Sequence, residues 1–284
     1  MPIDKQNALQ EMVRDHLSSA TVSIFQDNSV MASLLPMVKS EGSLVYQYTQ
    51  IEELMGATIR DLGENVTGGT IEPIKKVEYL KVLATEVLID RLYVSGGLGN
   101  VINVKAENMM NATIGLANTF NKMIYYGDGS DKQLRGLDKR LAEDGVGKKF
   151  DAQADTLFDI LDEAVDYVNY SQHGTKAILM NAKTRRVLTK ALKANGIYVE
   201  TSLDVAGRKC ATYYDMPIVI DEAIKDNEIF IVNLSQVDGL HGVTLQGITG
   251  YEEESRGSFV AIGTDFAVSL AVRHPKAFAK VVIA

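Results

Sequence analysis

One stretch of the chain, residues 43–74, has the pattern of two strands joined by a turn but few large apolar residues. Its first part, SLVYQYTQI, is rich in the β-branched and aromatic residues that favour a pleated strand. Gly63, Gly68 and Gly69 interrupt the following segment, which is typical of a long hairpin. A two-stranded hairpin is only marginally stable in water. We therefore expect this hairpin to lie on another surface, and that surface to belong to another molecule.

A long amphipathic helix is predicted over residues 105–125. Its inward side chains recur at helical spacing: Met109, Thr113, Leu116, Ala117, Phe120, Met123 and Ile124. The helix runs into the sequence YYGDGSDKQLRGL, in which Gly127 is the expected C-terminal breaker. The pattern indicates a long helix followed by a turn.

The turn sequence GDGS, residues 127–130, also has the composition of a phosphate or metal loop. A Walker-type loop needs a lysine before its hydroxyl, and a dinucleotide loop needs a third glycine; neither is present here. Lys132 and Leu134 occupy positions where a calcium loop needs oxygen ligands. We therefore predict a turn that ends the helix and binds neither a phosphate nor a metal.

The rest of the chain mixes helices and strands without a regular alternation, which predicts an α+β fold. Residues 1–40 are read as a short helix in NALQEMVRDHL followed by an extended arm over SSATVSIFQDNS. Beyond Gly145 the patterns predict two helices, at 155–169 and 181–196. The predicted strands are 176–180, 216–221, 228–234, 258–262, 266–272 and 277–283.

Composition excludes several classes of protein. The 284 residues suffice for two domains or one elaborated domain. A net charge of −8 gives no electrostatic reason to bind nucleic acid or an anionic membrane. Cys210 is the single cysteine, so no intrachain disulfide can form. Neither a signal-peptide pattern nor a membrane-spanning apolar run is present, and we expect a soluble protein of a reducing cytoplasm.

No catalytic constellation stands out in the sequence. The four histidines are far apart in the chain, and no G-x-S-x-G nucleophile motif occurs. Arg208 and Lys209 could lower the pKa of Cys210, but we interpret this cysteine as an ordinary small residue. The acids of YEEESRGS fit a charged loop better than an acid–base pair. We predict no catalytic, cofactor-binding or metal-binding residue, and a protein that is not an enzyme.

Three stretches, in this order, resemble the major capsid proteins of tailed bacteriophages, which have the Hong Kong 97 (HK97)-like fold. The first is the long helix followed by a G-[DN]-G-[ST]…G-[LI] motif, although Leu134–Arg135 replaces the usual proline. The second, residues 177–199, is similar to the family's strand, asparagine-led helix and glycine stop. The third, residues 213–234, is similar to the strand pair that follows. The residues that match the first motif are Gly127, Asp128, Gly129, Ser130, Gly136 and Leu137.

The resemblance implies an architecture for the whole chain. Residues 1–42 would form an N-terminal arm, and 43–74 the extended hairpin loop, or E-loop, that lies across an adjacent subunit. A peripheral domain with its spine helix would span 75–134, and an axial domain 135–245 would approach the centre of a hexamer or pentamer. The C-terminal strands, 246–284, would return to the peripheral domain. The GDGS motif would then be a structural turn, in which glycine supplies positive φ at no steric cost.

The implied function is a shell subunit that self-assembles into the icosahedral head around the double-stranded DNA of a tailed phage. It would reside in the virion after assembly in the bacterial host cytoplasm. Its partners would be other copies, a separate scaffolding protein, a portal protein and a decoration protein, with no membrane and no cofactor. The candidate contact residues are Arg60, Asp61, Glu64 and Asn65 at the hairpin tip, and Lys75 and Lys76 pairing with Glu252, Glu253, Glu254 and Arg256 between peripheral domains. The alternative for these charges is a solvated surface.

Two departures from the family pattern carry expectations of their own. Some members join a hairpin lysine covalently to a neighbour's asparagine, but no lysine lies between Ser43 and Ile74. We therefore do not expect this cross-link. Only about forty residues precede the hairpin, which we read as too few for a cleaved scaffolding segment. The acidic balance suits a container that must not adhere to its genome.

Two rival functions stay open on the sequence alone. An encapsulin-type nanocompartment shares the fold and packages an enzyme instead of DNA. A cytoplasmic α+β enzyme with a site assembled from scattered residues would instead predict a small oligomer with a deep polar pocket.

Overall fold

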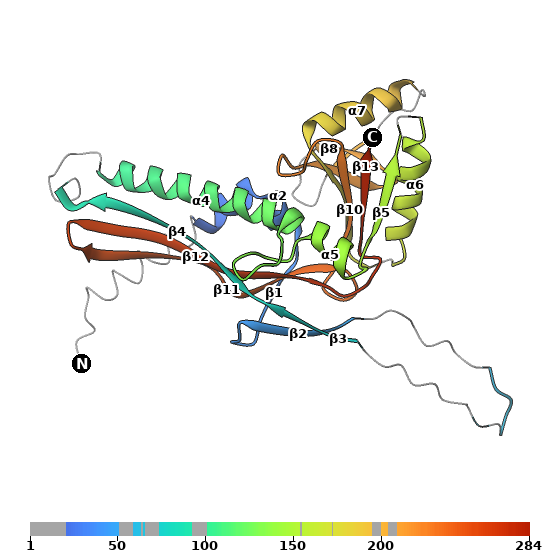
Figure 1. The fold of residues 1–284 in the computed structure, drawn as a ribbon, viewed down its shortest axis with the longest axis horizontal. Helices are drawn as coiled ribbons and strands as arrows, with labels where there is room; N and C mark the ends of the chain where they lie inside the picture. Colours follow the sequence, from blue (N-terminus) through green and yellow to red (C-terminus); the bar gives the residue numbers. More distant parts are fainter. Residues whose placement is uncertain are drawn as a thin grey trace.

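The computed structural model describes residues 21–50, 59–63, 65, 74–92, 101–153, 155–171, 173–194, 200–203 and 209–284. The side chains of 101–106, 194, 200–203, 209–210 and 252–256 lie outside that description. The subunit has an elongated body, an α/β unit at one end of it, and a hairpin that projects away from both (Figure 1).

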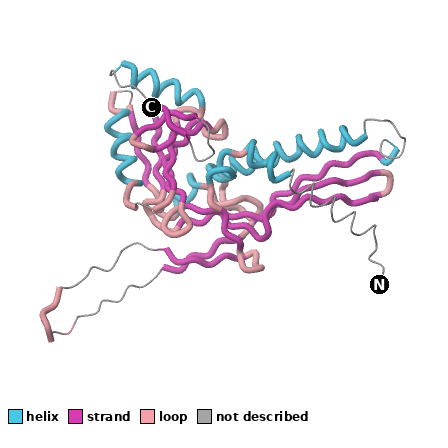
Figure 2. The backbone as a smooth tube through the Cα atoms, turned by 180° about the vertical axis from the view of Figure 1, so that it is seen from behind, coloured by secondary structure: helices cyan, strands magenta, loops and turns pink. Residues whose placement is uncertain are grey.

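The elongated body is a sheet of long antiparallel strands with one helix on its face. Strand β12 (Phe259–Val272) lies between β4 (Lys81–Asp90) and β11 (Leu240–Arg256). Helix α4 (Val101–Tyr126) covers one face of this sheet (Figure 1, Figure 2). The predicted helix over 105–125 is thus confirmed and begins four residues earlier. Strand β12 is continuous, so the prediction of separate strands at 258–262 and 266–272 is wrong.

A second unit, called here the α/β unit, spans residues 148–234 and 278–283. Its strands pair in the order β5, β13, β10, β6, β9, β8 and β7. Helices α6 (Leu157–Val168) and α7 (Ala182–Ala194) bury their apolar sides in one cluster against this sheet. The strands are β5 (Lys148–Ala152), β13 (Phe278–Ile283), β10 (Glu228–Leu234), β6 (Thr175–Met180), β9 (Met216–Ile220), β8 (Lys209–Tyr213) and β7 (Glu200–Leu203).

The last strand of the chain differs from expectation. We expected the residues after 245 to return together to the sheet of the spine helix, and β11 and β12 do lie there. Strand β13, however, pairs with β10 and β5 inside the α/β unit. Strand β13 thus lies between β10 and β5, and together with the pairing of β10 and β11 in one continuous sheet it ties the two units together.

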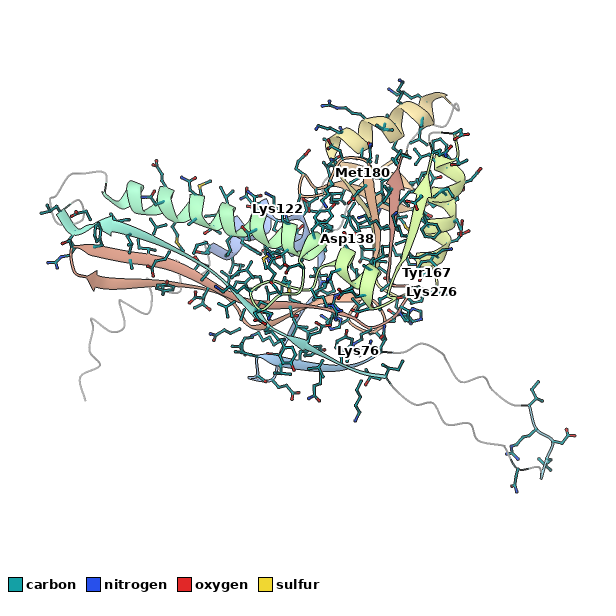
Figure 3. The ribbon with its side chains drawn as sticks, viewed as in Figure 1. Lys76, Lys122, Asp138, Tyr167, Met180 and Lys276 are labelled. Atoms are coloured by element: carbon teal, nitrogen blue, oxygen red, sulfur yellow. The ribbon has the colours of Figure 1, made fainter. Side chains whose placement is uncertain are left out.

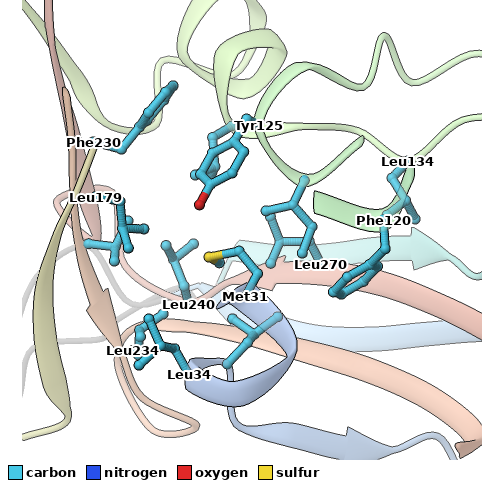
Figure 4. Packing of buried hydrophobic residues seen from close by; sticks show 14 of the residues in the cluster. Met31, Leu34, Phe120, Tyr125, Leu134, Leu179, Phe230, Leu234, Leu240 and Leu270 are labelled. Carbon is cyan, nitrogen blue, oxygen red and sulfur yellow. The ribbon is translucent and has the colours of Figure 1, made fainter. Parts of the chain in front are cut away.

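The two units share the largest hydrophobic cluster of the described residues (Figure 4). Phe120 and Tyr125 from α4 enter it from one side, and Leu179 and Phe230 from β6 and β10 enter it from the other. The Tyr125 hydroxyl donates to the Asp221 carboxylate at 2.9 Å. Burial is the first cause that raises the pKa of Tyr125, and Asp221 adds to it. The junction is therefore packed and its buried hydroxyl is satisfied.

The N-terminal segment is not the extended arm that the sequence predicted. Residues 21–28 are helical rather than extended, and α2 (Val30–Leu34) follows with Ser29 as its N-cap. The Phe25 ring packs against the rings of Phe120 and Phe266, with each pair of centroids 5.4 Å apart. Strand β1 (Met37–Lys39) then pairs in parallel with β11. Residues 21–39 are thus part of the core; the helix predicted before them lies outside the described residues.

We expect Phe25→Ala to destabilise the subunit by about 3–5 kcal/mol, because it empties a ring-sized space between α4 and β12. Gln26→Ala, at an exposed position of the same helix, should change stability by less than about 0.5 kcal/mol. Urea unfolding of unassembled subunits measures both. Equal, small effects would show that this segment is not part of the core.

Candidate assembly surfaces

The hairpin tip presents apolar side chains to solvent. Ile59 and Leu62 have relative exposures of 99% and 106%, and they flank Arg60 and Asp61. The tip lies far from the rest of the subunit (Figure 1). An apolar pair with no cover in its own subunit marks an interaction site. Arg60, Asp61 and Asn65 lie at this tip, and their contact with a neighbouring subunit stays a prediction; Glu64 lies outside the described residues.

The hairpin stem is a separate two-stranded sheet of β2 (Val45–Gln50) and β3 (Ile74–Tyr79). Lys75 and Lys76 of β3 are exposed, and Figure 3 shows Lys76 at the stem. The other predicted partners are on the outer end of β11, at the far end of the elongated body. One subunit therefore does not bring the two charged groups together. Glu252, Glu253 and Arg256 are placed only by their backbone pairing with β12, and Glu254 falls in the irregularity between them.

A buried arginine fixes the stem to the body. Arg140 of α5 (Leu137–Glu143) has a side chain only 3% exposed, and its guanidinium is 2.7 Å from the Glu78 carboxylate of β3. The same guanidinium donates to the backbone carbonyl oxygens of Leu270 and Arg135, at 2.7 and 3.0 Å. The cation is therefore fully paired, and it joins β3, β12 and the turn after α4.

An aromatic cluster seals this attachment. The rings of Tyr46 and Tyr48 stack on each other and meet the edge of the buried His241 ring. The Tyr48 hydroxyl is 3.4 Å from the Glu78 carboxylate. Burial first, and then the Glu78 charge, raise the pKa of Tyr48 to about 12. Tyr48 thus stays a neutral donor to Glu78 of β3, while its ring packs against His241 of β11.

We expect the subunit to lose stability in acid through His241. Burial, and then the Arg273 charge, lower the pKa of His241 to about 4, below its ordinary 6.5. Because the unfolded chain binds this proton more readily, stability is full above pH 6.5 and falls as the pH drops toward 4. The loss should be about 2–3 kcal/mol between pH 7 and 4.5. Urea unfolding at the two pH values should show a smaller loss for His241→Gln; an identical loss would contradict this assignment.

The GDGS turn reverses the chain between α4 and α5. Asp128 pairs as a β-bridge with Arg135, and the Gly136 amide donates to the Gly127 carbonyl at 2.9 Å. The Asp128 carboxylate accepts from the Ser130 amide at 2.9 Å, which lowers the pKa of Asp128. The turn closes on itself through its own backbone, as expected of a structural turn.

The reason for the glycines differs in part from the prediction. Gly129 has φ +72° and needs glycine for that conformation. Gly127 and Gly136 are not in the positive-φ region. A Cβ on Gly127 would lie 2.6 Å from the Met123 carbonyl oxygen and closer still to that of Leu134, and one on Gly136 would lie 2.5 Å from the Gly127 nitrogen. Close backbone approach, rather than φ, requires these two glycines.

The described residues give little basis for catalysis. No group of three or more histidine, cysteine, aspartate or glutamate side chains among them could hold a metal ion. Two open hollows of about 790 and 570 Å³ lie beside α6 and α7. Neither contains a histidine, cysteine or serine in its lining. No helix in the described part of the chain is long and apolar enough to cross a membrane.

Three solved structures illustrate what this fold is similar to. The chain matches the capsid of an empty GTA particle with a TM-score of 0.64 and 16% identity, over 90% of each chain. It matches a structure from Mycobacterium phage Bobi with a TM-score of 0.61 and 12% identity, over 90% of each chain. It matches a virus-like particle from Pyrococcus furiosus with a TM-score of 0.62 and 13% identity, over 95% of this chain and 99% of that chain. These likenesses define the class: a subunit with the HK97-like shell fold.

The amino-acid sequence also matches the model of a protein family. Residues 100–283 match the model of the phage capsid family, so the chain belongs to that family and is a capsid shell protein. A comparison with curated protein sequences found no match. The predicted α+β class and the HK97-like fold are both confirmed.

Sequence reasoning missed the residues that the structure makes most prominent. Arg140 occurs in LDKRLAE, which has the composition of a solvated helix, and its burial depends on contacts distant in sequence. Ile59 and Leu62 stand in a polar stretch where the charged residues drew attention. An alternation of apolar and charged residues at a predicted hairpin tip was the available signal for Ile59 and Leu62.

Proposed function

We propose that the chain is the major capsid protein of a tailed bacteriophage and forms the icosahedral head around double-stranded DNA. The observation that carries the proposal is the projecting hairpin with its uncovered apolar tip. Such a tip has no function in a lone subunit, and it gains a cover when copies repeat around a shell. The net charge of −8 supports enclosure of DNA without adhesion.

The proposal includes partners. The hairpin tip binds to another copy of the chain. The charged residues of β3 pair with those at the outer end of β11 of a neighbouring subunit. A separate scaffolding protein, a portal protein and a decoration protein complete the head, which assembles in the host cytoplasm. The subunit has no catalytic role in this proposal.

Polar substitution of the tip tests the proposal. Ile59→Ser combined with Leu62→Ser should leave the unfolding midpoint unchanged, because both side chains are solvent-exposed in the free subunit. Shell yield should fall about tenfold or more, since interface anchors carry about 2 kcal/mol or more each. Val237→Ser, at an exposed apolar position on the turn between β10 and β11, is the matched control. Normal shells from the tip variant would contradict the proposed role of the hairpin.

An encapsulin-type compartment is the second candidate, because a virus-like particle and an encapsulin complex, from Pyrococcus furiosus and Synechococcus elongatus, share the fold. Particles isolated from the native source separate the two. Nuclease-protected DNA of uniform length supports the phage head, whereas a single packaged protein without DNA supports the compartment.

A further inference from the structure

Two helices of the α/β unit carry opposite charge. Helix α7 has the sequence AKTRRVLTKALKA, with five cations and no acid. Helix α6 has the sequence LFDILDEAVDYV, with four acids and no cation. The chain as a whole is acidic, so a helix as basic as α7 is a local exception.

The charged sides of both helices are turned outward. The apolar sides of α6 and α7 enter one core cluster, through Leu161 and Val165 of α6 and through Leu188 and Leu192 of α7. The opposite sides face solvent. The exposed charged residues on them are Asp159, Glu163, Asp166, Lys183, Arg185, Arg186, Lys190 and Lys193.

Only part of this charge is neutralised within the subunit. Lys183 pairs with Asp226 and Glu163 pairs with Lys148, at 2.8 and 2.9 Å. Among the described residues, no ion pair joins α6 to α7. In that same part of the chain no ion pair involves Asp159, Asp166, Arg185, Arg186, Lys190 or Lys193.

The two helices cover the same face of their sheet but lie over opposite ends of its strand order, called here its two flanks. Helix α6 runs along the side that faces away from α4, and its closest strands are β13 and β5 (Figure 1). Helix α7 lies over the other end of the strand order, at the top of the unit in both views (Figure 1, Figure 2). The acidic and the basic surface are therefore open to different neighbours.

The surfaces beside α6 and α7 also differ in shape. Beside α6, the β8–β9 turn presents Tyr214, 65% exposed, next to Asp215. Both residues have positive φ, at 47° and 62°, which is an unusual conformation for non-glycine residues and defines a tight two-residue turn. Beside α7, the hollow of about 570 Å³ includes Leu188, Ala211 and Ile218 in its lining. One flank thus offers an aromatic anchor within acids, and the other an apolar recess within cations.

We infer that α7 of one copy docks against α6 and the Tyr214 turn of the next copy. The contact is heterologous, because different surfaces of each subunit meet, and a heterologous contact with a suitable rotation closes into a ring. Opposite charges select the neighbour and fix its register, and Tyr214 fills the recess beside α7 as an anchor. The inference rests on the proposed function, since a shell brings copies around a common axis.

Charge exchange tests the contact on the full chain. The first variant reverses the basic helix with Arg185→Glu, Arg186→Glu and Lys190→Glu. The second reverses the acidic helix with Asp159→Lys, Glu163→Lys and Asp166→Lys. The third combines both sets. A matched control reverses three exposed lysines elsewhere, with Lys39→Glu, Lys122→Glu and Lys132→Glu.

The first and second variants should each lower the yield of rings and shells about tenfold or more, because like charges then face each other. The combined variant should restore the yield to within about threefold of the parent chain. The lysine control should assemble normally although its net charge changes equally. Electron microscopy and light scattering measure the assemblies, and thermal unfolding checks that each variant is folded.

Several outcomes would overturn the inference while the proposed shell function stands. One is normal shells from the first or the second variant. Another is a combined variant that is folded yet fails to recover. A third is a basic-helix variant that assembles but retains less DNA, which would give α7 a nucleic-acid partner instead. Failure of the unmodified chain to assemble would count against the proposed function itself.

Discussion

Gly127→Ala should yield little or no folded subunit. The added methyl group would lie 2.6 Å from the Met123 carbonyl oxygen and closer to that of Leu134, both of which are backbone atoms. Neither can move without breaking the turn, in which the Gly136 amide bonds the Gly127 carbonyl. Overpacking against backbone should cost more than about 3 kcal/mol. Soluble yield and the urea unfolding midpoint measure the effect.

Gly115→Ala is the matched control within the same helix. Nothing lies within 4 Å of a Cβ at Gly115, and the residue is exposed on α4. Alanine there should stabilise the subunit by about 0.5–1 kcal/mol, because it favours the helix over the unfolded chain. A Gly127→Ala subunit as stable as the parent chain would mean that the turn does not require close approach.

Arg140→Met should destabilise the free subunit by about 3–5 kcal/mol, since removal of one partner leaves a buried charge unpaired. Glu78 would lose its cation, and the carbonyls of Leu270 and Arg135 would lose their donor. The stem of the hairpin would also lose its main polar attachment to the body. Hydrogen exchange should therefore rise in β2 and β3 before it rises in α4.

Lys139→Met is the control at the adjacent position. Lys139 pairs with Glu143 on the exposed side of α5, and such surface pairs contribute about 0.2–1 kcal/mol. The double variant Arg140→Met with Glu78→Gln should be less destabilised than the sum of its single changes, because no unpaired charge then remains. If the destabilisation of the double variant equals the sum of the two single changes, Arg140 and Glu78 do not stabilise each other.

Local periodicity explains what could be predicted from the sequence. The stripe of α4 and the glycine that ends it follow from helical spacing alone, and β10 occupies the predicted residues 228–234. The order of these elements suggested the family, and the match to the family model confirmed it. The helix and the strand are encoded by residues close in sequence, whereas the family resemblance depends on the order of three stretches between residues 105 and 234.

The features that sequence reasoning missed depend on distant contacts. Residues 21–28 have no helical period, and burial of Phe25 between α4 and β12 decides their place. The sequence predicted a break between 262 and 266, but the strand continues there because β4 and β11 pair with it on both sides through Gly263 and Thr264. The local sequence around Arg140 is typical of a solvent-exposed helix, and only contacts with β3 and β12 bury this residue. Such pairings are not encoded in a local pattern.

Direct observation of assembled particles is the most direct test of the claim that this chain forms a shell. The full chain, expressed alone and again with a co-expressed scaffolding protein, would be viewed by electron microscopy while light scattering gives the mass. The shell account predicts closed particles, tubes, or free rings of five or six copies, with diameters that begin to set the shell symmetry. A subunit that stays a monomer or a dimer under both conditions, at every concentration tested, would contradict it.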